Sequence, residues 1–135
     1  ETANLILSAF ADKAHKRDIS MEIKAQIPTM PAVSESDLCV LLSNALENAL
    51  HACMQVQAKG LPAAIDVMAY QQKDTFFIQI RNSCEENVEF VNEIPVTRRA
   101  GHGIGVRSIC AVVERYGGLY SFSAANGQFI LRVSL

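Results

Sequence analysis

Apolar and polar positions repeat with two different periods along the chain, and these periods predict its first elements. Residues 2 to 16 carry apolar side chains at helical spacing, whereas residues 19 to 27 alternate apolar and polar side chains as a half-buried strand does. The segment SESD then places an acid three residues after a serine, a pattern that caps a helix start. We therefore expect a long helix from about Ser36 to Ala58.

The middle of the chain is predicted to hold a hairpin followed by a long loop. Residues 63 to 72 and 75 to 83 have the pattern of two strands joined by a polar turn, QQKD. From 84 to 100 neither period is present, and this polar stretch is longer than the usual connection between elements. Loops of this length are often functional.

The last third of the chain predicts one more helix and one more hairpin. Residues 103 to 118 have a period near 3.6 and end in a double glycine, and the chain then closes as two strands that turn at Asn126 and Gly127. Helices combined with largely antiparallel strands indicate an α+β fold in two layers.

Composition limits the class of protein. The chain has 135 residues, of which 50% are hydrophobic, as expected of one globular domain spanning 1–135. Its 12 basic and 14 acidic residues are dispersed, so no basic run indicates a nucleic-acid surface, and no apolar run approaches the roughly 20 residues of a membrane span. Four widely spaced cysteines without a CxxC pair favour a reduced, cytoplasmic setting: Cys39, Cys53, Cys84 and Cys110.

Two asparagines lie four residues apart in the long helix, in LLSNALENALHAC. Each asparagine costs about 0.6 kcal/mol of helix stability relative to alanine. Five polar residues at helical spacing share an arc of roughly 100°, and we call them the asparagine stripe: Asn44, Glu47, Asn48, His51 and Gln55. An amide oxygen suits Mg²⁺, which usually takes substrate phosphates as further ligands. A tolerant solvent-exposed face is an equally good interpretation of this stripe taken alone.

A second candidate site is the glycine segment AGHGIGVRS, in which Gly101, Gly103 and Gly105 alternate where a helix begins. Glycine lets backbone amides approach an anion, and a helix N-terminus adds free N–H groups and partial positive charge. The segment lacks the Gly-Lys-Ser/Thr ending of a P-loop, and it lies too late in the chain for a Rossmann loop. Arg107 and Ser108 would add a cation and a hydroxyl, although a plain flexible connection has the same pattern.

Together these two segments resemble the ATP-binding domain of the GHKL superfamily. DLCVLLSNALENALHAC is similar to its N-box, and GHGIGVRSICAVVERYGG to its second glycine box, in order and spacing closest to the AgrC-like quorum-sensing histidine kinases. The resemblance implies a two-layer α/β sandwich of the Bergerat type that binds ATP with Mg²⁺. It also implies γ-phosphate transfer to a histidine on a dimerisation domain, relay to a response regulator, a homodimeric full-length protein, and a cytoplasmic location in a membrane-anchored kinase.

The resemblance also assigns roles to residues. Asn48 would hold Mg²⁺, and His51 would contact phosphate. Asn44 stands where ATP-hydrolysing relatives carry a glutamate, and since an amide cannot act as a general base, phosphoryl transfer is favoured over hydrolysis. The first glycine box is missing, and Asn82 is the candidate to replace its adenine-binding aspartate. The remaining ATP contacts would come from the glycine segment: Gly101, His102, Gly103, Ile104, Gly105, Val106, Arg107 and Ser108.

The same resemblance assigns roles to two segments of the chain. Residues 1–17 would form a helix that continues from a dimerisation region, and His15 on it would be a surface histidine and not the phosphoacceptor. Residues 84–100 would be the ATP lid, in which Arg98 and Arg99 keep the lid solvated. Two alternatives stay open: a serine kinase of the anti-sigma type, or a degenerate module that binds a partner protein without turning over nucleotide. A zinc site at His51 and Cys53 lacks ligand pairs at the usual spacings.

Overall fold

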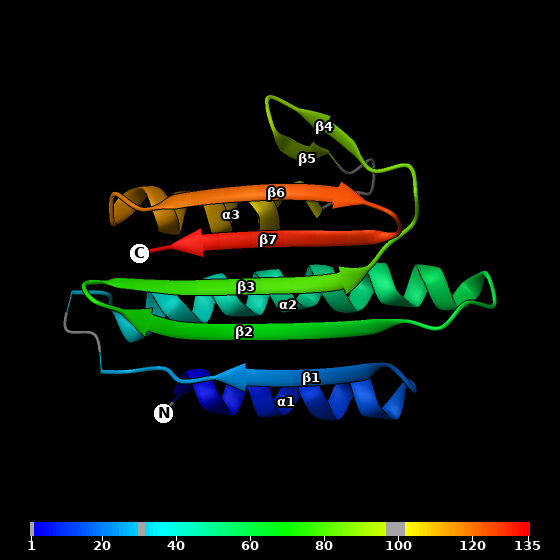
Figure 1. Ribbon diagram of the computed structural model, residues 1–135, viewed down its shortest axis with the longest axis horizontal. Helices are drawn as coiled ribbons and strands as arrows, with labels where there is room; N and C mark the ends of the chain where they lie inside the picture. The colour runs from blue at the N-terminus through cyan, green and yellow to red at the C-terminus, as the bar shows by residue number, and fades with distance from the viewer. Residues whose placement is uncertain (1, 30–31, 97–101) are drawn as a thin grey trace.

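The computed structural model describes residues 2–29, 32–96 and 102–135, which form a sheet backed by helices (Figure 1). The described helices are α1 (Thr2–Lys16), α2 (Glu35–Ala58) and α3 (His102–Arg115). The described strands are β1 (Ser20–Ala25), β2 (Ala64–Gln72), β3 (Thr75–Ser83), β4 (Glu89–Val91), β5 (Ile94–Val96), β6 (Leu119–Ala125) and β7 (Gln128–Ser134).

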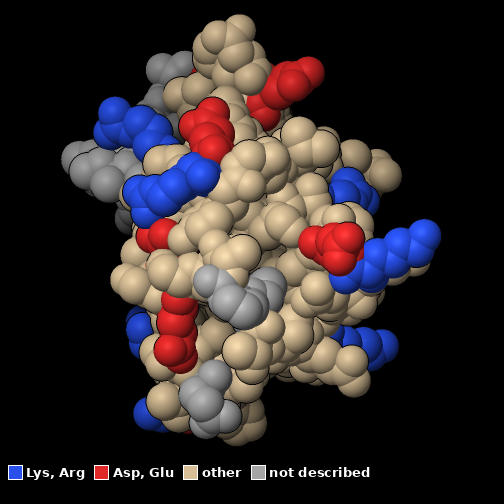
Figure 2. Space-filling view, turned by 90° about the vertical axis from the view of Figure 1, so that its left-hand side faces the viewer, with Lys and Arg blue, Asp and Glu red and all other residues tan. Residues whose placement is uncertain are grey.

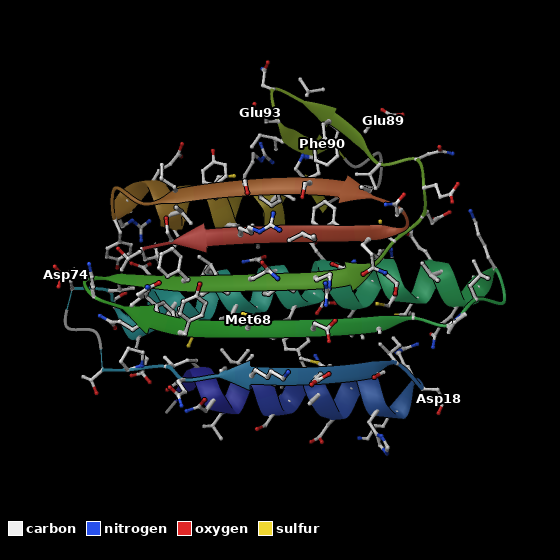
Figure 3. All side chains as sticks on the ribbon, viewed as in Figure 1. Asp18, Met68, Asp74, Glu89, Phe90 and Glu93 are labelled. Carbon is white, nitrogen blue, oxygen red and sulfur yellow. The ribbon has the colours of Figure 1, made fainter. Side chains whose placement is uncertain are left out.

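The main sheet has five strands in the order β1-β2-β3-β7-β6. β1 pairs with β2 in parallel, and the other neighbours pair antiparallel. All three described helices lie behind this sheet in Figure 1, and none of them lies on the face toward the viewer, which carries Met68 in Figure 3. The predicted α+β, two-layer sandwich with a mostly antiparallel sheet is therefore confirmed.

The core lies between the helices and the inner face of the sheet. Leu41 and Leu46 of α2 are fully buried, and strand residues with even spacing, such as Ile78 and Ile80 of β3, are 2% exposed. The alternation that predicted the strands is the alternation between this core face and the open face. α2 begins at Glu35, one residue before the expected start, because the Ser34 hydroxyl accepts a hydrogen bond from the Asp37 amide at 3.0 Å and caps the helix.

Both predicted hairpin turns are present. β6 and β7 turn at Asn126 and Gly127, whose φ angles of 54° and 75° belong to the left-handed region that asparagine and glycine tolerate best. β2 and β3 turn at Lys73 and Asp74, since Gln72 pairs with Thr75.

The prediction that 84–100 lacks regular structure is wrong for part of this stretch. β4 and β5 form a small antiparallel hairpin, with Asn92 and Glu93 at its turn in left-handed conformations, φ 53° and 67°. Strands of three residues are too short to display a period, and Pro95 argued against a strand. Residues 97–100 lie outside the described residues.

Ile78→Val tests the core assignment of the sheet. Loss of one buried methylene from the inner face of β3 is expected to lower the free energy of unfolding by about 1 kcal/mol. Denaturant unfolding followed by circular dichroism measures this change. The matched control is Ile130→Val in the neighbouring strand β7, on the open face beside the exposed Arg81, where we expect less than about 0.5 kcal/mol. Equal losses in both variants would contradict the assignment of the two faces.

No described helix is both long enough and apolar enough to cross a membrane. Figure 2 shows the end of the molecule that lies on the left in Figure 1. Acidic and basic side chains are interspersed over the residues that are described on this end, in keeping with the net charge of −2.

Candidate functional site

A cavity of about 350 Å³ lies between α2, α3, the inner face of the sheet and the β4–β5 hairpin. Cavities that hold small ligands usually start near 300 Å³ and combine apolar walls with a few placed polar groups. Much of the surface of this cavity is apolar and comes from β3, α3, β6 and β7, namely Ile80, Ile109, Phe122, Phe129 and Leu131. The polar groups come from the elements described next.

The asparagine stripe of α2 supplies one polar wall. Asn48, His51 and Gln55 line the cavity, whereas Glu47 is exposed and lies outside its lining. The Nε2 atom of His51 is buried. Three of the five stripe residues therefore face a cavity that α3 and the sheet close. The other two stripe residues, Asn44 and Glu47, lie outside the lining.

Asn44 does not line this cavity but lies against the first turn of α3. Its Nδ2 donates to the carbonyl of Val40 at 2.8 Å. A Cβ atom placed on Gly105 would lie 3.2 Å from Oδ1 of Asn44 and 3.6 Å from Oδ1 of Asn48. The absence of a side chain at Gly105 thus allows the start of α3 to pack directly on both amides. The two segments singled out from the sequence meet at this point.

Asn82 is placed on the inner face of β3, near the end of the strand, and lines the cavity. It is only 3% exposed, and its Nδ2 donates to the carbonyl of Ser83 at 2.9 Å. That hydrogen bond uses the donor side of the amide, so Oδ1 is the side suited to accept a hydrogen bond from a ligand.

The other predicted residues fall into three groups. Val106 lines the cavity, Ser108 is half-buried, and Arg107 is exposed in the second turn of α3. His102, Gly103 and Ile104 form the beginning of the α3 backbone. Gly101, together with Arg98 and Arg99, lies outside the described residues.

Sequence reasoning missed the contribution of the β4–β5 hairpin. Phe90, labelled on this hairpin in Figure 3, stacks on Phe129 with centroids 6.4 Å apart, and Phe129 lies 6.1 Å from Phe122. Pro95 and Val96 of the same hairpin also line the cavity. The hairpin therefore closes the site through aromatic contacts to the sheet. Alternation in β6 and β7 marked the two sheet phenylalanines as inward, but nothing in the sequence marked Phe90.

The segment after β3 adds a thiol and a carboxylate to the cavity wall. Burial raises the pKa of the Cys84 thiol, so the thiol stays protonated at neutral pH and acts as a small apolar surface. Glu85 pairs with Lys59, just beyond α2, at 2.5 Å, which ties this segment to the helix. Cys53 lies behind the wall, fully buried, with its pKa raised to about 11 by burial.

The arrangement has a chemical direction. Oδ1 of Asn82 and the apolar wall suit a planar group that carries an amino donor. The N-terminus of α3, whose Gly105 packs close to Oδ1 of Asn48, provides free N–H groups for an anion. Among the described residues no three His, Cys, Asp or Glu side chains gather as a metal site. A divalent cation would therefore use the hard oxygen of Asn48 and oxygens of the ligand itself.

Comparison with known proteins gives a family match and several structural matches. A family model described as "GHKL domain" matches residues 33–135. No curated protein sequence matches the chain.

The structural matches are to histidine kinases. The catalytic domain of histidine kinase ThkA matches with a TM-score of 0.75 at 14% identity, covering 98% of this chain and 88% of that one. The mycobacterial sensor histidine kinase MprB matches with a TM-score of 0.70 at 18% identity, covering 98% and 92%. The histidine kinase domain from the Erythrobacter litoralis EL346 blue-light activated histidine kinase matches with a TM-score of 0.75 at 13% identity, covering 98% of this chain and 58% of that one. Matches at such low identity show that the fold is shared.

Proposed function

The chain belongs to the GHKL domain family, and on this basis we propose that it is the ATP-binding catalytic domain of a two-component sensor histidine kinase. It would bind ATP with Mg²⁺ and pass the γ-phosphate to a histidine on a separate dimerisation domain. An aspartate of a response regulator would then receive the phosphoryl group.

One observation carries this proposal. Asn48, His51 and Gln55 of the asparagine stripe, Val106 of α3 and the buried Asn82 line a single cavity, although they come from three distant parts of the sequence. Groups suited to phosphates come from α2 and the start of α3, an acceptor suited to adenine comes from β3, and apolar side chains line the same cavity. This combination of groups suits ATP. The likeness in fold to histidine kinase catalytic domains supports the kinase class.

Each residue then has a role. Oδ1 of Asn82 accepts a hydrogen bond from the adenine amino group, and the first turn of α3, from His102 onward, holds the phosphates through backbone N–H groups, together with Gly101, which precedes it in the sequence. His51 contacts phosphate beside Asn48, which holds Mg²⁺. When bound, Mg²⁺ neutralises phosphate charge that develops during phosphoryl transfer.

Asn44 separates transfer from hydrolysis. A side-chain amide cannot take a proton from water, so the chain alone is expected to hydrolyse ATP slowly. Replacing Asn44 by Ala should leave that slow rate, measured at saturating ATP by phosphate release, unchanged within about twofold, because no general base is lost. Asn44→Asp serves as the matched variant, since it installs a carboxylate. Rapid hydrolysis by the wild type that disappears in Asn44→Ala would contradict this role.

Calorimetric titration with a non-hydrolysable ATP analogue, with and without Mg²⁺, tests the proposed function. Binding that strengthens with Mg²⁺ is expected. Absence of binding to the folded chain would overturn the proposal and favour a module that binds a partner protein without nucleotide. Phosphorylation of a partner's serine by the chain would instead identify an anti-sigma-type kinase.

The domain plan follows from the same proposal. α1 would continue from the dimerisation region that carries the phosphoacceptor histidine, so a homodimer is expected for the full-length protein. Residues 84–100 would act as the ATP lid, of which 84–96 are described and include β4 and β5. We also propose that the domain works in the cytoplasm, in a membrane-anchored kinase of the AgrC-like quorum-sensing group.

A further inference from the structure

A polar cluster joins the other ends of the two helices that carry the phosphate end of the site. Asp37, in the first turn of α2, accepts a hydrogen bond from the hydroxyl of Tyr116, and its Oδ1 pairs with Nη1 of Arg115 at 2.6 Å. The same Tyr116 hydroxyl accepts a hydrogen bond from the amide of Ser34 at 3.0 Å. Ser34 is the N-cap of α2, and Arg115 is the last residue of α3. One carboxylate and one phenol therefore link the start of α2 to the end of α3.

This cluster differs from an ordinary surface ion pair in the low exposure of its carboxylate. The Asp37 side chain is only 17% exposed, although that of Arg115 is 58% exposed. The hydrogen bonds from Tyr116 and Arg115 hold the pKa of the Asp37 carboxyl below its ordinary value, so the carboxylate is charged at neutral pH. The cluster combines three interactions: a helix cap, a phenol hydrogen bond and an ion pair. Together they fix both the distance and the relative orientation of the two helix ends.

α2 and α3 run in opposite directions behind the sheet (Figure 1). From Asp37 to Asn48, α2 rises about 16 Å, and from Gly105 to Arg115, α3 rises about 15 Å, at 1.5 Å per residue. The two helices therefore contact each other at two places, and the distance between these places is nearly the same along α2 as along α3. At one end is the cluster, and at the other the contact of Gly105 with the two asparagines.

The start of α3 packs closely on α2 at Gly105. A Cβ atom there would lie 3.2 Å from Oδ1 of Asn44, so the position of α3 along α2 decides which backbone atoms of its first turn face the amides. Helices are stiff along their axes, and a constraint at one end is felt at the other.

We propose that Ser34, Asp37, Arg115 and Tyr116 form a register clamp, which fixes the position of α3 along α2 and thereby holds the first turn of α3 in place against Asn44 and Asn48. Asp37 and Tyr116 are positioning residues for the phosphate end of the cavity. The effect of the register clamp on nucleotide binding rests on the proposed function, whereas the coupling between the two helix ends does not.

The coupling is tested without nucleotide. In NMR spectra of the free chain, Tyr116→Phe and Asp37→Asn are expected to shift the backbone amide of Gly105 and the side-chain amides of Asn44 and Asn48. The matched control is Asp66→Asn, which removes the exposed ion pair with Arg81, 3.0 Å long, on the open face of the sheet. It should leave these signals in place. Unchanged signals in both clamp variants would overturn the proposal whatever the chain binds.

The second measurement compares a non-hydrolysable ATP analogue with adenosine, which has no phosphates. Each clamp variant is expected to bind the Mg²⁺ complex of the analogue about fivefold more weakly, a coupling of ordinary size between linked sites, while its affinity for adenosine stays within about twofold of the wild type. Equal losses for both ligands would overturn a positioning role, because general destabilisation affects the whole cavity. If the wild type binds neither ligand, the proposed function fails, and the amide signals of the free chain still decide on the clamp.

Discussion

The Asn48→Ala variant is expected to lose the Mg²⁺-dependent part of nucleotide binding, with the affinity for a non-hydrolysable ATP analogue falling about a hundredfold in the presence of Mg²⁺. Changes to groups that only support a metal ligand cost about 10- to 100-fold, and loss of the ligand itself should reach the upper end. Asn48 is the stripe residue that both lines the cavity and lies against Gly105. Titration calorimetry at matched ionic strength, with Mg²⁺ or with EDTA, measures the effect.

A neighbouring residue provides the control for this experiment. Glu47 precedes Asn48 on the same helix but is exposed, so Glu47→Ala should bind the analogue as the wild type does. Without Mg²⁺, the Asn48→Ala variant and the wild type should bind alike, because only the metal-linked contact is missing. A variant that binds equally well with Mg²⁺ would show that the metal is held elsewhere. Unfolding midpoints of both variants distinguish this result from a damaged fold.

The sequence sufficed for the parts of the fold that are set by local pattern. The period of α2, its Ser34 cap and the Asn126-Gly127 turn are each determined by residues within one or two turns of one another. The order of the strands is not determined in this way. The alternation of Met21 and Ile23 in β1 would be the same beside any neighbour, and the parallel pairing with β2 depends on contacts between residues more than 40 positions apart.

The candidate site also has parts that local pattern predicts and parts that depend on contacts between distant segments. The asparagine stripe could be predicted because helical spacing alone sets its members on one arc. Its partners could not be predicted, because the contact of Asn44 with Gly105 joins two helices that are separated by the sheet strands in sequence. Phe122 and Phe129 look in the sequence like ordinary core residues of a hairpin. Only the packing of the β4–β5 hairpin over them turns that part of the core into the wall of a cavity.

The two ends of the cavity are therefore separable in experiment. Changes at Asn48 or in the register clamp should act on phosphate and metal, and leave adenosine binding nearly intact. Changes near the end of β3 should act on the base, and reduce binding of adenosine and ATP alike. This contrast follows from the roles proposed for Asn48 on α2 and Asn82 on β3, which both line the cavity.

Replacing Asn82 by Leu is expected to weaken both adenosine and the ATP analogue about tenfold, with or without Mg²⁺. Leucine has nearly the shape of asparagine but no acceptor, so the adenine amino group would be buried without a hydrogen-bond partner, at a cost of about 1–3 kcal/mol. Asn82 is suited to this role because its Nδ2 already donates to the Ser83 carbonyl, at 2.9 Å, which leaves Oδ1 as the amide atom that can accept a hydrogen bond. Competition titrations with adenosine and the analogue measure both affinities.

The companion variant Asn82→Asp keeps an acceptor oxygen but loses the hydrogen bond from Nδ2 to the Ser83 carbonyl, so its affinity for adenosine is expected to fall, but less than that of Asn82→Leu. Inosine, which replaces the adenine amino group by a carbonyl oxygen, should bind the wild type poorly, and the Leu variant should discriminate less between inosine and adenosine. If Asn82→Leu instead binds adenosine as tightly as the wild type, the base is not recognised at the end of β3. In that case the buried amide of Asn82 would serve only to fix the Ser83 carbonyl, and adenine would have to be recognised by another part of the cavity wall.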